Sequence, residues 1–522
     1  MKNPEIFAVI CVYMLVIIGI GVFFYKRSKK NPENYFLGGR SLGPWITAMS
    51  AESSDMSGWL LMGLPGVAYW CGLADAFWTA LGLAIGTYVN WLIVARRLRN
   101  YSQVANNSIT VPDFFSNRFK EKNKVIMAIS SLFILIFFTV YAASCFVTCG
   151  KLFSVLFGWP YHSMLIAGAI FVVVYTIIGG FLAESVSDFM QAIVMIVALV
   201  VMIVVGLVNA GGFANVIENA KAIPGYFSLD KVATPGYQNG MATFGASKPY
   251  GFINSLSMLA WGLGYFGMPQ VLLRFMAIRK PSELKRSRII ATVWCVISLC
   301  AAVFIGIIGR TLLRNDANLN SATGAESILI VMSTTYLPLI LAGIIMAGIL
   351  AATISSSDSY LLIASSAVSV NIYKGIIKKD KEVSDKKVVL LSRIVLIVIA
   401  LIGVAIAWDE DSVIFDIVSF AWSGFGATFG PIMLFSLFWK KTSRAGAIAG
   451  MITGGASVFI WKLVLKGCFG DTVALFNIYE LLPAFILSCI VIFVVSLFTK
   501  VPKEVQNEFE KVKKINKGFL AD

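Results

Sequence analysis

Several carboxylates of this chain lie inside long apolar segments, where an acidic side chain is costly. Near the middle of a membrane-spanning helix a carboxylate costs about 2.5–3.5 kcal/mol, so such residues are candidates for ion binding or gating. Water lowers this cost for Asp75 and Asp416, which lie near segment ends, and favours a structural role for both. The acids that lie deeper or among hydroxyl side chains are the ion-coupling candidates, and they are Glu52, Asp55, Asp188 and Asp358.

The segment that contains Asp55 is a poor continuous helix. Residues 50–59 read Ser-Ala-Glu-Ser-Ser-Asp-Met-Ser-Gly-Trp, and Gly63, Pro65 and Gly66 follow. A break in a membrane helix frees backbone carbonyls that must find partners away from bulk water. A bound cation can satisfy them, and the ends of the half-helices supply matching dipoles. The alternative is ordinary packing of helices through glycine.

A second interrupted segment lies at residues 261–269, which read Trp-Gly-Leu-Gly-Tyr-Phe-Gly-Met-Pro. It comes five apolar segments after the first one. Two interrupted helices in corresponding positions are expected of an inverted repeat, and such a pair points to the binding site of a transporter. We therefore predict two five-helix units, at about residues 44–209 and 250–438, each beginning with a broken helix.

Residues 352–359 add a run of hydroxyl side chains, Ala-Thr-Ile-Ser-Ser-Ser-Asp-Ser. Ser355 and Ser359 are four residues apart and share a helix face, and Ser356 lies beside them. Hydroxyl and carboxylate oxygens are hard ligands, which suit Na⁺ better than a transition metal. The alternative is that these serines bond back to their own helix or cross to a neighbouring one.

The composition places these segments in a membrane. Of 522 residues, 58% are hydrophobic and 14% are charged, whereas a soluble domain has about 25% charged residues. This excludes a soluble enzyme, a disordered chain and a collagen-like chain, and the long apolar runs argue against a transmembrane β-barrel. A spanning helix needs about 20 apolar residues, and we predict an all-α protein with thirteen such helices. They are residues 5–25, 44–66, 71–95, 125–157, 161–182, 187–209, 250–277, 288–312, 334–372, 390–407, 413–438, 445–465 and 478–498.

The distribution of charge predicts the orientation. The net charge is +15, the basic loops all follow odd-numbered segments, and the loop at residues 409–411, after an even-numbered segment, is acidic. By the positive-inside rule we expect the N-terminus outside and the C-terminus in the cytoplasm, in the plasma (inner) membrane. The basic clusters are interpreted as orientation signals and not as nucleic-acid sites. Residues 1–498 are expected to form a single transmembrane domain, and residues 499–522 a short charged cytoplasmic tail.

The chain lacks the motifs of enzymes and of ATP-driven pumps. It has no Cys-x-x-Cys pair and no phosphate-binding GxxxxGK[ST] loop, and His162 alone cannot build a metal cluster. No nucleophile and base stand in a recognisable pattern. We therefore expect a membrane protein that is not an enzyme, surrounded by lipid and without an obligate protein partner.

Three stretches of the chain carry long and specific motifs. Residues 54–66 read Ser-Asp-Met-Ser-Gly-Trp-Leu-Leu-Met-Gly-Leu-Pro-Gly, residues 260–267 read Ala-Trp-Gly-Leu-Gly-Tyr-Phe-Gly, and residues 420–431 read Phe-Ala-Trp-Ser-Gly-Phe-Gly-Ala-Thr-Phe-Gly-Pro. A short signature follows at Lys441, Gly446, Ala447 and Gly450. Over essentially its whole length the chain resembles the sodium:solute symporter family, and most closely its sodium/proline symporter branch.

The resemblance implies a five-plus-five inverted-repeat (LeuT-like) core that works by alternating access. It also implies a Na⁺ site between the broken second helix and the ninth helix, Na⁺ being the co-transported ion. Carried over residue by residue, the Na⁺ ligands are the backbone carbonyls of Ser53, Met56 and Ala352 and the hydroxyls of Ser355 and Ser356. Asp188 resembles an acid of the sixth helix that the family ties to Na⁺.

The substrate implied by the resemblance is L-proline. A small zwitterion with an apolar ring needs aromatic walls and a few fixed polar groups. The matching residues are Asp55, Ser57, Trp59, Tyr141, Trp261 and Tyr265. The alternative is a symporter for another small amino acid or carboxylate, coupled to Na⁺ or H⁺.

Three positions depart from the branch. Glu52 replaces a small residue, Asp358 is an extra acid in the helix-nine motif, and Ser356 stands where a threonine is usual. The two extra acids leave the ion stoichiometry and proton coupling open, and Glu52 either pairs with a basic residue or is protonated in the apolar core. A transporter-like sensor and a passive channel are the other functional classes, and only a transporter accumulates its substrate.

Overall fold

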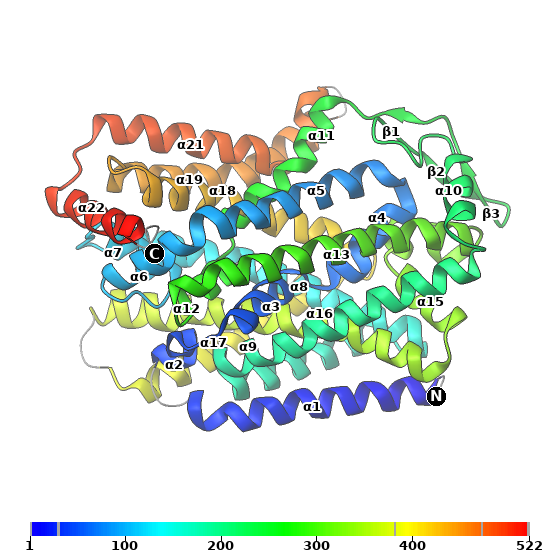
Figure 1. Cartoon of the computed structure of the whole chain (residues 1–522), viewed down its shortest axis with the longest axis horizontal. Coiled ribbons are helices and arrows are strands. Elements are labelled where there is room, and N and C mark those ends of the chain that lie inside the picture. Colours follow the sequence, from blue (N-terminus) through cyan, green and yellow to red (C-terminus); the bar gives the residue numbers. More distant parts are fainter. Residues whose placement is uncertain (1–2, 29–31, 380–382, 471–472, 519–522) are drawn as a thin grey trace.

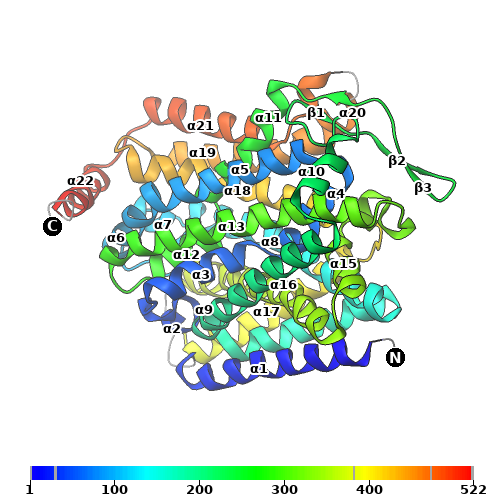
Figure 2. The ribbon, with the colours of Figure 1, turned by 45° about the vertical axis from the view of Figure 1, so that its right-hand side comes forward.

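The molecule is a bundle of long helices that run side by side (Figure 1). The structure, a computed structural model, describes residues 3–28, 32–379, 383–470 and 473–518. The N-terminus and the C-terminal helix lie at opposite ends of the bundle in both views (Figures 1 and 2). The long helices are α1 (Pro4–Ser28), α5 (Leu73–Val89), α8 (Val125–Phe157), α9 (Tyr161–Asn209), α13 (Leu284–Leu312), α16 (Leu339–Ser366), α17 (Asp385–Ile406), α18 (Ile414–Phe438), α19 (Arg444–Phe459) and α21 (Leu481–Phe498).

Shorter elements extend or connect these helices. The short α-helices are α2 (Pro32–Leu37), α6 (Ala95–Val104), α7 (Val111–Arg118), α10 (Phe213–Lys221), α14 (Ala322–Ala325), α15 (Ile328–Tyr336), α20 (Gly467–Phe469) and α22 (Lys503–Gly518). Wider π-helical turns are η3 (Asn90–Val94), η7 (Ala367–Ile377) and η8 (Ile460–Lys466), and tight 3₁₀ turns are η1 (Gly38–Arg40), η5 (Pro281–Glu283), η6 (Ala317–Leu319) and η9 (Ala474–Asn477).

Two spans are broken, at the positions expected from the sequence. The first consists of α3 (Pro44–Asp55), the π-helical η2 (Trp59–Gly63) and α4 (Leu64–Cys71). The second consists of α11 (Phe252–Leu259), the 3₁₀-helical η4 (Ala260–Phe266) and α12 (Pro269–Ala277), and its two arms meet at 42°. Pro269 starts α12 because a proline at the first helical position loses no helix hydrogen bond.

The predicted count of thirteen spanning helices is not confirmed. Among the described residues, eleven helices are long and apolar enough to cross a membrane, or twelve if the bent pair α11–α12 is one span. The remaining predicted segment, 44–66, is divided at Met56 into pieces that are each too short to qualify. The difference therefore arises at the helix break itself.

The predicted start of the sixth segment, at residue 187, is wrong. The spans on either side of the kink are Tyr161–Ile178 and Gly180–Asn209, and Gly180 has φ 67° and ψ 172°. This backbone conformation is open to glycine and strained for other residues. The polar stretch that includes Glu184 and Asp188 suggested a loop, but its side chains point into the protein. Asp188 consequently lies about two turns inside the helix.

Residues 210–250, between α9 and α11, fold into a small subdomain. It contains α10 and two short antiparallel pairs, β1 (Lys231–Val232) with β4 (Lys248–Pro249) and β2 (Pro235–Gln238) with β3 (Met241–Phe244). This subdomain lies at the same end of the bundle as the N-terminus, whereas α6, α7 and α22 lie at the other end (Figure 1). The arginines of α6 and the lysines of α22 are thus on the side opposite the N-terminus.

The broken spans pack against their neighbours through close backbone contacts. A Cβ atom on Gly262 of η4 would stand 2.2 Å from the carbonyl oxygen of Gly82 in α5. A Cβ atom on Gly306 of α13 would stand 2.4 Å from the carbonyl oxygen of Pro65 in α4. The seventh span, α11–α12, therefore packs on the third span, α5. In the same way the second span, α3–α4, packs on the eighth span, α13. This matched packing fits an inverted repeat.

Candidate transport site

The break in the first of the two broken spans exposes backbone groups in the protein interior. Helix α3 ends where Met56 adopts φ −91° and ψ 79°. The amide of Met56 still donates to the carbonyl of Glu52 at 2.9 Å, and the chain resumes helical bonding when Leu60 donates to Ser57 at 3.0 Å. Every residue from Ala48 to Pro65 except Met49 is essentially inaccessible to solvent. The break therefore lies deep in the bundle, away from bulk water.

Helix α16 supplies hydroxyl groups directly to this break. The Ser355 hydroxyl donates to the carbonyl of Ser53 at 2.9 Å and to that of Ala352 at 3.1 Å. The Ser356 hydroxyl donates to the same Ser53 carbonyl at 3.3 Å. Both hydroxyl oxygens keep lone pairs for a cation. Four of the five predicted Na⁺ ligands are thus brought together by two helices that lie about 300 positions apart in the chain.

Met56, the fifth predicted ligand, ends α3 beside this group. Its sulfur accepts a hydrogen bond from Ser298 of α13 at 3.6 Å. The described residues hold no cluster of three or more His, Cys, Asp or Glu side chains suited to a metal ion. The oxygens gathered here are neutral carbonyls and hydroxyls, which suit a hard monovalent cation.

The predicted substrate residues form an aromatic cluster on the other side of the break. The rings of Trp59 and Trp261 lie 6.2 Å apart, centre to centre, and Trp261 lies 5.1 Å from both Phe415 and Tyr479. The indole of Trp422 donates to the carbonyl of Trp261 at 2.8 Å, which fixes η4 against α18. Tyr265 packs edge-on against Trp422, with ring centres 5.1 Å apart.

Asp55 connects the cluster to the break. Its carbonyl accepts hydrogen bonds from the indole of Trp59 at 3.2 Å and from the Tyr141 hydroxyl at 3.3 Å. Its carboxylate Oδ1 accepts from the amide of Gln270 at 3.2 Å. Within the described chain, Asp55 Oδ2 and the hydroxyls of Ser57 and Tyr265 are buried without a hydrogen-bond partner. These polar atoms lie beside apolar ring faces, as recognition of a small zwitterion requires.

Arg274 of α12 organises the deeper acids, which sequence reasoning left unconnected. Its guanidinium donates to Asp188 at 3.1 Å, to the Ser359 hydroxyl at 2.8 Å and to Glu184 in a very short ion pair. Asp188 also accepts from the Ser50 hydroxyl of α3 at 2.7 Å. One fully buried cation therefore joins four helices next to the hydroxyl run of α16.

Glu184, Arg274 and Gln270 are site residues that the sequence reasoning did not select. Glu184 carried a usable signal, because it lies one helical turn before Asp188, although the predicted segments 161–182 and 187–209 leave it in the gap between them. Arg274 and Gln270 carried a weaker one, since both lie in the predicted apolar segment 250–277 and their spacing does not show which helix they contact. Their roles follow from tertiary contacts that pair α12 with α3 and α9.

The two extra acids occupy different environments. Asp358 lies within α16, and its Oδ1 accepts from the backbone amide of the next residue, Ser359, at 2.7 Å. Glu52 points away from α16 and accepts from the indole of Trp91 at 3.2 Å. Among the described residues no basic side chain pairs with Glu52, and the hydrogen-bond partner of its carboxylate is the uncharged N–H of Trp91.

A cavity lies beside the aromatic cluster, on the side of the bundle that carries the N-terminus. It has a volume of about 260 Å³ and is lined by Gly66, Trp70, Asp75, Glu326, Phe415 and Asp416, among others. Phe415 separates it from Trp261. Glu326 accepts from the backbone amides of Ile414 and Phe415 at 3.0 Å each and pairs with Lys151 at 2.8 Å, which fixes the start of α18.

The chain matches a known family over most of its length. The sodium:solute symporter family matches residues 35–454. A curated Staphylococcus aureus relative described as a sodium/proline symporter is 40% identical over 515 residues, which cover 98% of this chain and 96% of the relative. These matches confirm the resemblance stated from the sequence.

Solved structures match the fold at low sequence identity. A Na⁺-coupled sialic acid symporter in a substrate-bound outward-open state aligns with a TM-score of 0.74 and 18% identity, covering 95% of this chain and 98% of that one. MhsT in complex with L-phenylalanine aligns with a TM-score of 0.52 and 14% identity, covering 87% and 97%. The predicted all-α, LeuT-like fold is confirmed.

Proposed function

The chain belongs to the sodium:solute symporter family, and from this premise we propose that it couples the inward flow of Na⁺ to the uptake of L-proline. The proposal takes the substrate from relatives that are 40% identical along nearly the whole chain. The proposed Na⁺ ligands are Ser53, Met56, Ala352, Ser355 and Ser356. The proposed substrate contacts are Asp55, Ser57, Trp59, Tyr141, Trp261 and Tyr265.

The observation that carries this proposal is the shared use of one helix break. Ser53 meets the hydroxyls of α16, and two residues later the Asp55 carbonyl meets Tyr141 and Trp59. An ion that orders the carbonyls of the break also orders the backbone that faces the aromatic cluster. Each ligand then binds more tightly when the other is present, and this linkage is reciprocal.

The energetics suit accumulation of a solute. One Na⁺ moving inward down about 100 mV releases about 2.3 kcal/mol. At about 1.4 kcal/mol per tenfold ratio, the voltage alone supports roughly a 40-fold gradient of substrate per ion. A Na⁺ concentration gradient adds to this ratio.

The proposed orientation has the N-terminus outside and the C-terminus in the cytoplasm. The arginines of α6 and the basic helix α22 lie together at the end opposite the N-terminus, as the positive-inside rule requires of a cytoplasmic face. The outer cavity at Phe415 then opens to the exterior. Residues 1–498 are proposed as one transmembrane domain, with repeats at about 44–209 and 250–438 that move around the site, and residues 499–522 as a cytoplasmic tail.

Uptake into proteoliposomes tests the function. With an inward Na⁺ gradient, radiolabelled L-proline is expected to accumulate above its external concentration and to leave again when the gradient is collapsed. Parallel vesicles receive an inward H⁺ gradient without Na⁺, and a panel of small amino acids and carboxylates competes with the label. Equal uptake with and without Na⁺ would contradict Na⁺ coupling, and absence of L-proline uptake beside uptake of a competitor would contradict the substrate.

Replacing Tyr141 by phenylalanine tests the substrate assignment. The change removes the hydroxyl that donates to the Asp55 carbonyl but keeps the ring stacked on Tyr360, 4.2 Å away. A neutral hydrogen bond contributes about 0.5–1.5 kcal/mol, so the KM for L-proline is expected to rise roughly 2- to 10-fold. Tyr101→Phe is the control, because the Tyr101 hydroxyl is buried at the opposite, basic end of the bundle. If Tyr141→Phe and Tyr101→Phe have the same KM for L-proline, the assignment of Tyr141 to the substrate site is wrong.

A further inference from the structure

Two arginines at the outer end of α13 lack an acidic partner. Arg310 is 2% exposed, and its Nη1 donates to Oδ1 of Asn320 at 2.9 Å. Its Nε and Nη2 are buried and, among the described residues, donate to no hydrogen-bond acceptor. Arg314 lies one turn further on and is exposed, and the described part of the chain gives neither arginine an ion pair.

Aromatic rings surround the two guanidinium groups. The Arg310 Cζ lies 4.7 Å from the ring centre of Tyr69 and 4.6 Å from that of Phe244. Arg314 approaches the same Phe244 ring at 5.5 Å. Ring faces attract a cation but carry no net charge. Two positive charges therefore share one ring. The Asp316 carboxylate caps η6 by accepting from the amide of Asn318, and among the described residues it forms no ion pair with either arginine.

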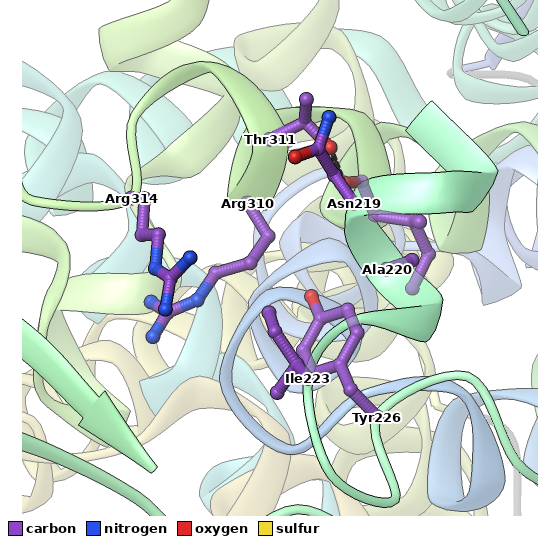
Figure 3. A pocket seen from close by; sticks show the side chains of 8 residues that line it. Asn219, Ala220, Ile223, Tyr226, Arg310, Thr311 and Arg314 are labelled. Atoms are coloured by element: carbon purple, nitrogen blue, oxygen red, sulfur yellow. Dashed lines mark hydrogen bonds between the residues drawn. The ribbon is translucent and has the colours of Figure 1, made fainter. Parts of the chain in front are cut away.

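A small cavity adjoins these side chains. Its volume is about 20 Å³, and Arg310, Arg314, Thr311, Asn219 and Tyr226 contribute to its wall. Figure 3 shows both guanidinium groups on one side of the cavity and Asn219 of α10 on the other. Buried donors without a protein partner typically contact an ordered water or an ion. A cavity of this volume accepts one such particle.

We propose that this cavity binds a single chloride ion. A water molecule accepts hydrogen bonds from the arginine donors but brings no charge, whereas chloride accepts the same hydrogen bonds and adds one negative charge beside the two guanidinium groups. The proposal concerns a site distinct from the transport site and does not depend on the proposed substrate.

The position of the cavity gives the ion a structural role. Tyr226 lines it, and the Tyr226 hydroxyl donates to the carbonyls of Ala68 at 2.7 Å and Tyr69 at 3.1 Å in α4. Phe244 belongs to β3 of the outer subdomain. Chloride therefore holds residues 210–250 against α4, the outer half of the broken span. A ligand that binds only the folded state stabilises that state.

Thermal unfolding of the purified full chain tests the proposal. The melting temperature is measured at constant Na⁺ and ionic strength while gluconate is exchanged for chloride. A saturable rise of about 1–3 °C is expected with chloride. Bromide is expected to replace chloride, and crystals grown in bromide are expected to show an anomalous peak beside Arg310. The same melting temperature in both anions would overturn the proposal, as would a bromide-soaked cavity that holds water only.

Arginine variants test whether the chloride-dependent rise in melting temperature arises at this cavity. Arg310→Lys and the less disruptive Arg314→Gln are both expected to abolish or weaken the rise, and Arg314 is exposed, so its removal leaves the core intact. Arg279→Gln is the control, because Arg279 is an exposed arginine paired with Glu283 instead of lining this cavity. An undiminished chloride response in Arg314→Gln and Arg310→Lys would assign the effect to another site and contradict the proposal.

Discussion

The Ser355→Ala variant is expected to need about ten-fold or more Na⁺ for half-maximal L-proline uptake. The change removes a hydroxyl oxygen from the proposed Na⁺ site and the donor to the carbonyls of Ser53 and Ala352. Loss of a buried polar partner costs about 1–3 kcal/mol, and 1.4 kcal/mol corresponds to a factor of ten. The measurement is initial uptake rate against external Na⁺ at fixed L-proline.

Ser357→Ala is the matched control for this prediction. Its hydroxyl is equally buried and only two residues away, but it donates to the Thr353 and Ile354 carbonyls of its own helix. The Na⁺ dependence of this variant is expected to stay close to that of the parent. If both variants shift the Na⁺ dependence alike, the effect belongs to the helix as a whole and the proposed ligand role of Ser355 is wrong.

Loss of Arg274 is expected to have the largest effect on stability. The residue is fully buried, and its single positive charge is shared by Glu184 and Asp188. Removing one partner of a buried ion pair costs about 3–5 kcal/mol, because the remaining charge stays buried. Arg274→Gln is therefore expected to lower the amount of folded protein in the membrane and its melting temperature after purification.

A compensating variant separates charge from packing. The double variant Arg274→Gln/Glu184→Gln replaces one of the two carboxylates that lose their cation by a neutral amide. It is therefore expected to be more stable than Arg274→Gln alone. Arg279→Gln, five positions further on and exposed, is expected to leave stability unchanged. A double variant as unstable as the single one would show that Arg274 acts through its shape and contacts, not its charge.

The sequence was sufficient to predict the broken helices and their role in the fold. Residues 50–59 and 261–269 concentrate polar groups, glycine and proline where a continuous apolar helix is expected, so each break is a local property. The convergence of Ser355 on Ser53 was available only through the family resemblance. Side-chain periodicity places Ser355 on a helix face but does not say which helix that face meets.

Long-range pairing limited the rest of the prediction. Arg274 and Glu184 are 90 positions apart, and neither motif nor spacing connects them. The predicted boundary between the segments 161–182 and 187–209 lies several residues after the kink at Gly180. The predicted count of thirteen spanning helices also differs from the structure. The break in segment 44–66 leaves two pieces, and each is shorter than a membrane span.

The central claim is that Na⁺ and L-proline stabilise the same helix break from its two sides. Asp55 lies between the groups that would hold each ligand. Its carbonyl accepts a hydrogen bond from Tyr141, and the carbonyl of Ser53, two residues earlier, accepts one from Ser355. This arrangement requires a coupling free energy between the two binding events. Coupling energies of this kind are typically about 1–3 kcal/mol, or roughly 5- to 150-fold in affinity.

Calorimetric titration of both ligands on the purified protein measures this coupling most directly. L-proline is titrated at a series of Na⁺ concentrations, and Na⁺ is titrated with and without saturating L-proline. The account predicts that each ligand lowers the Kd of the other by the same factor, and that Ser355→Ala reduces this factor while Ser357→Ala does not. A Kd for L-proline that is independent of Na⁺ would contradict the claim that one broken helix couples the two sites.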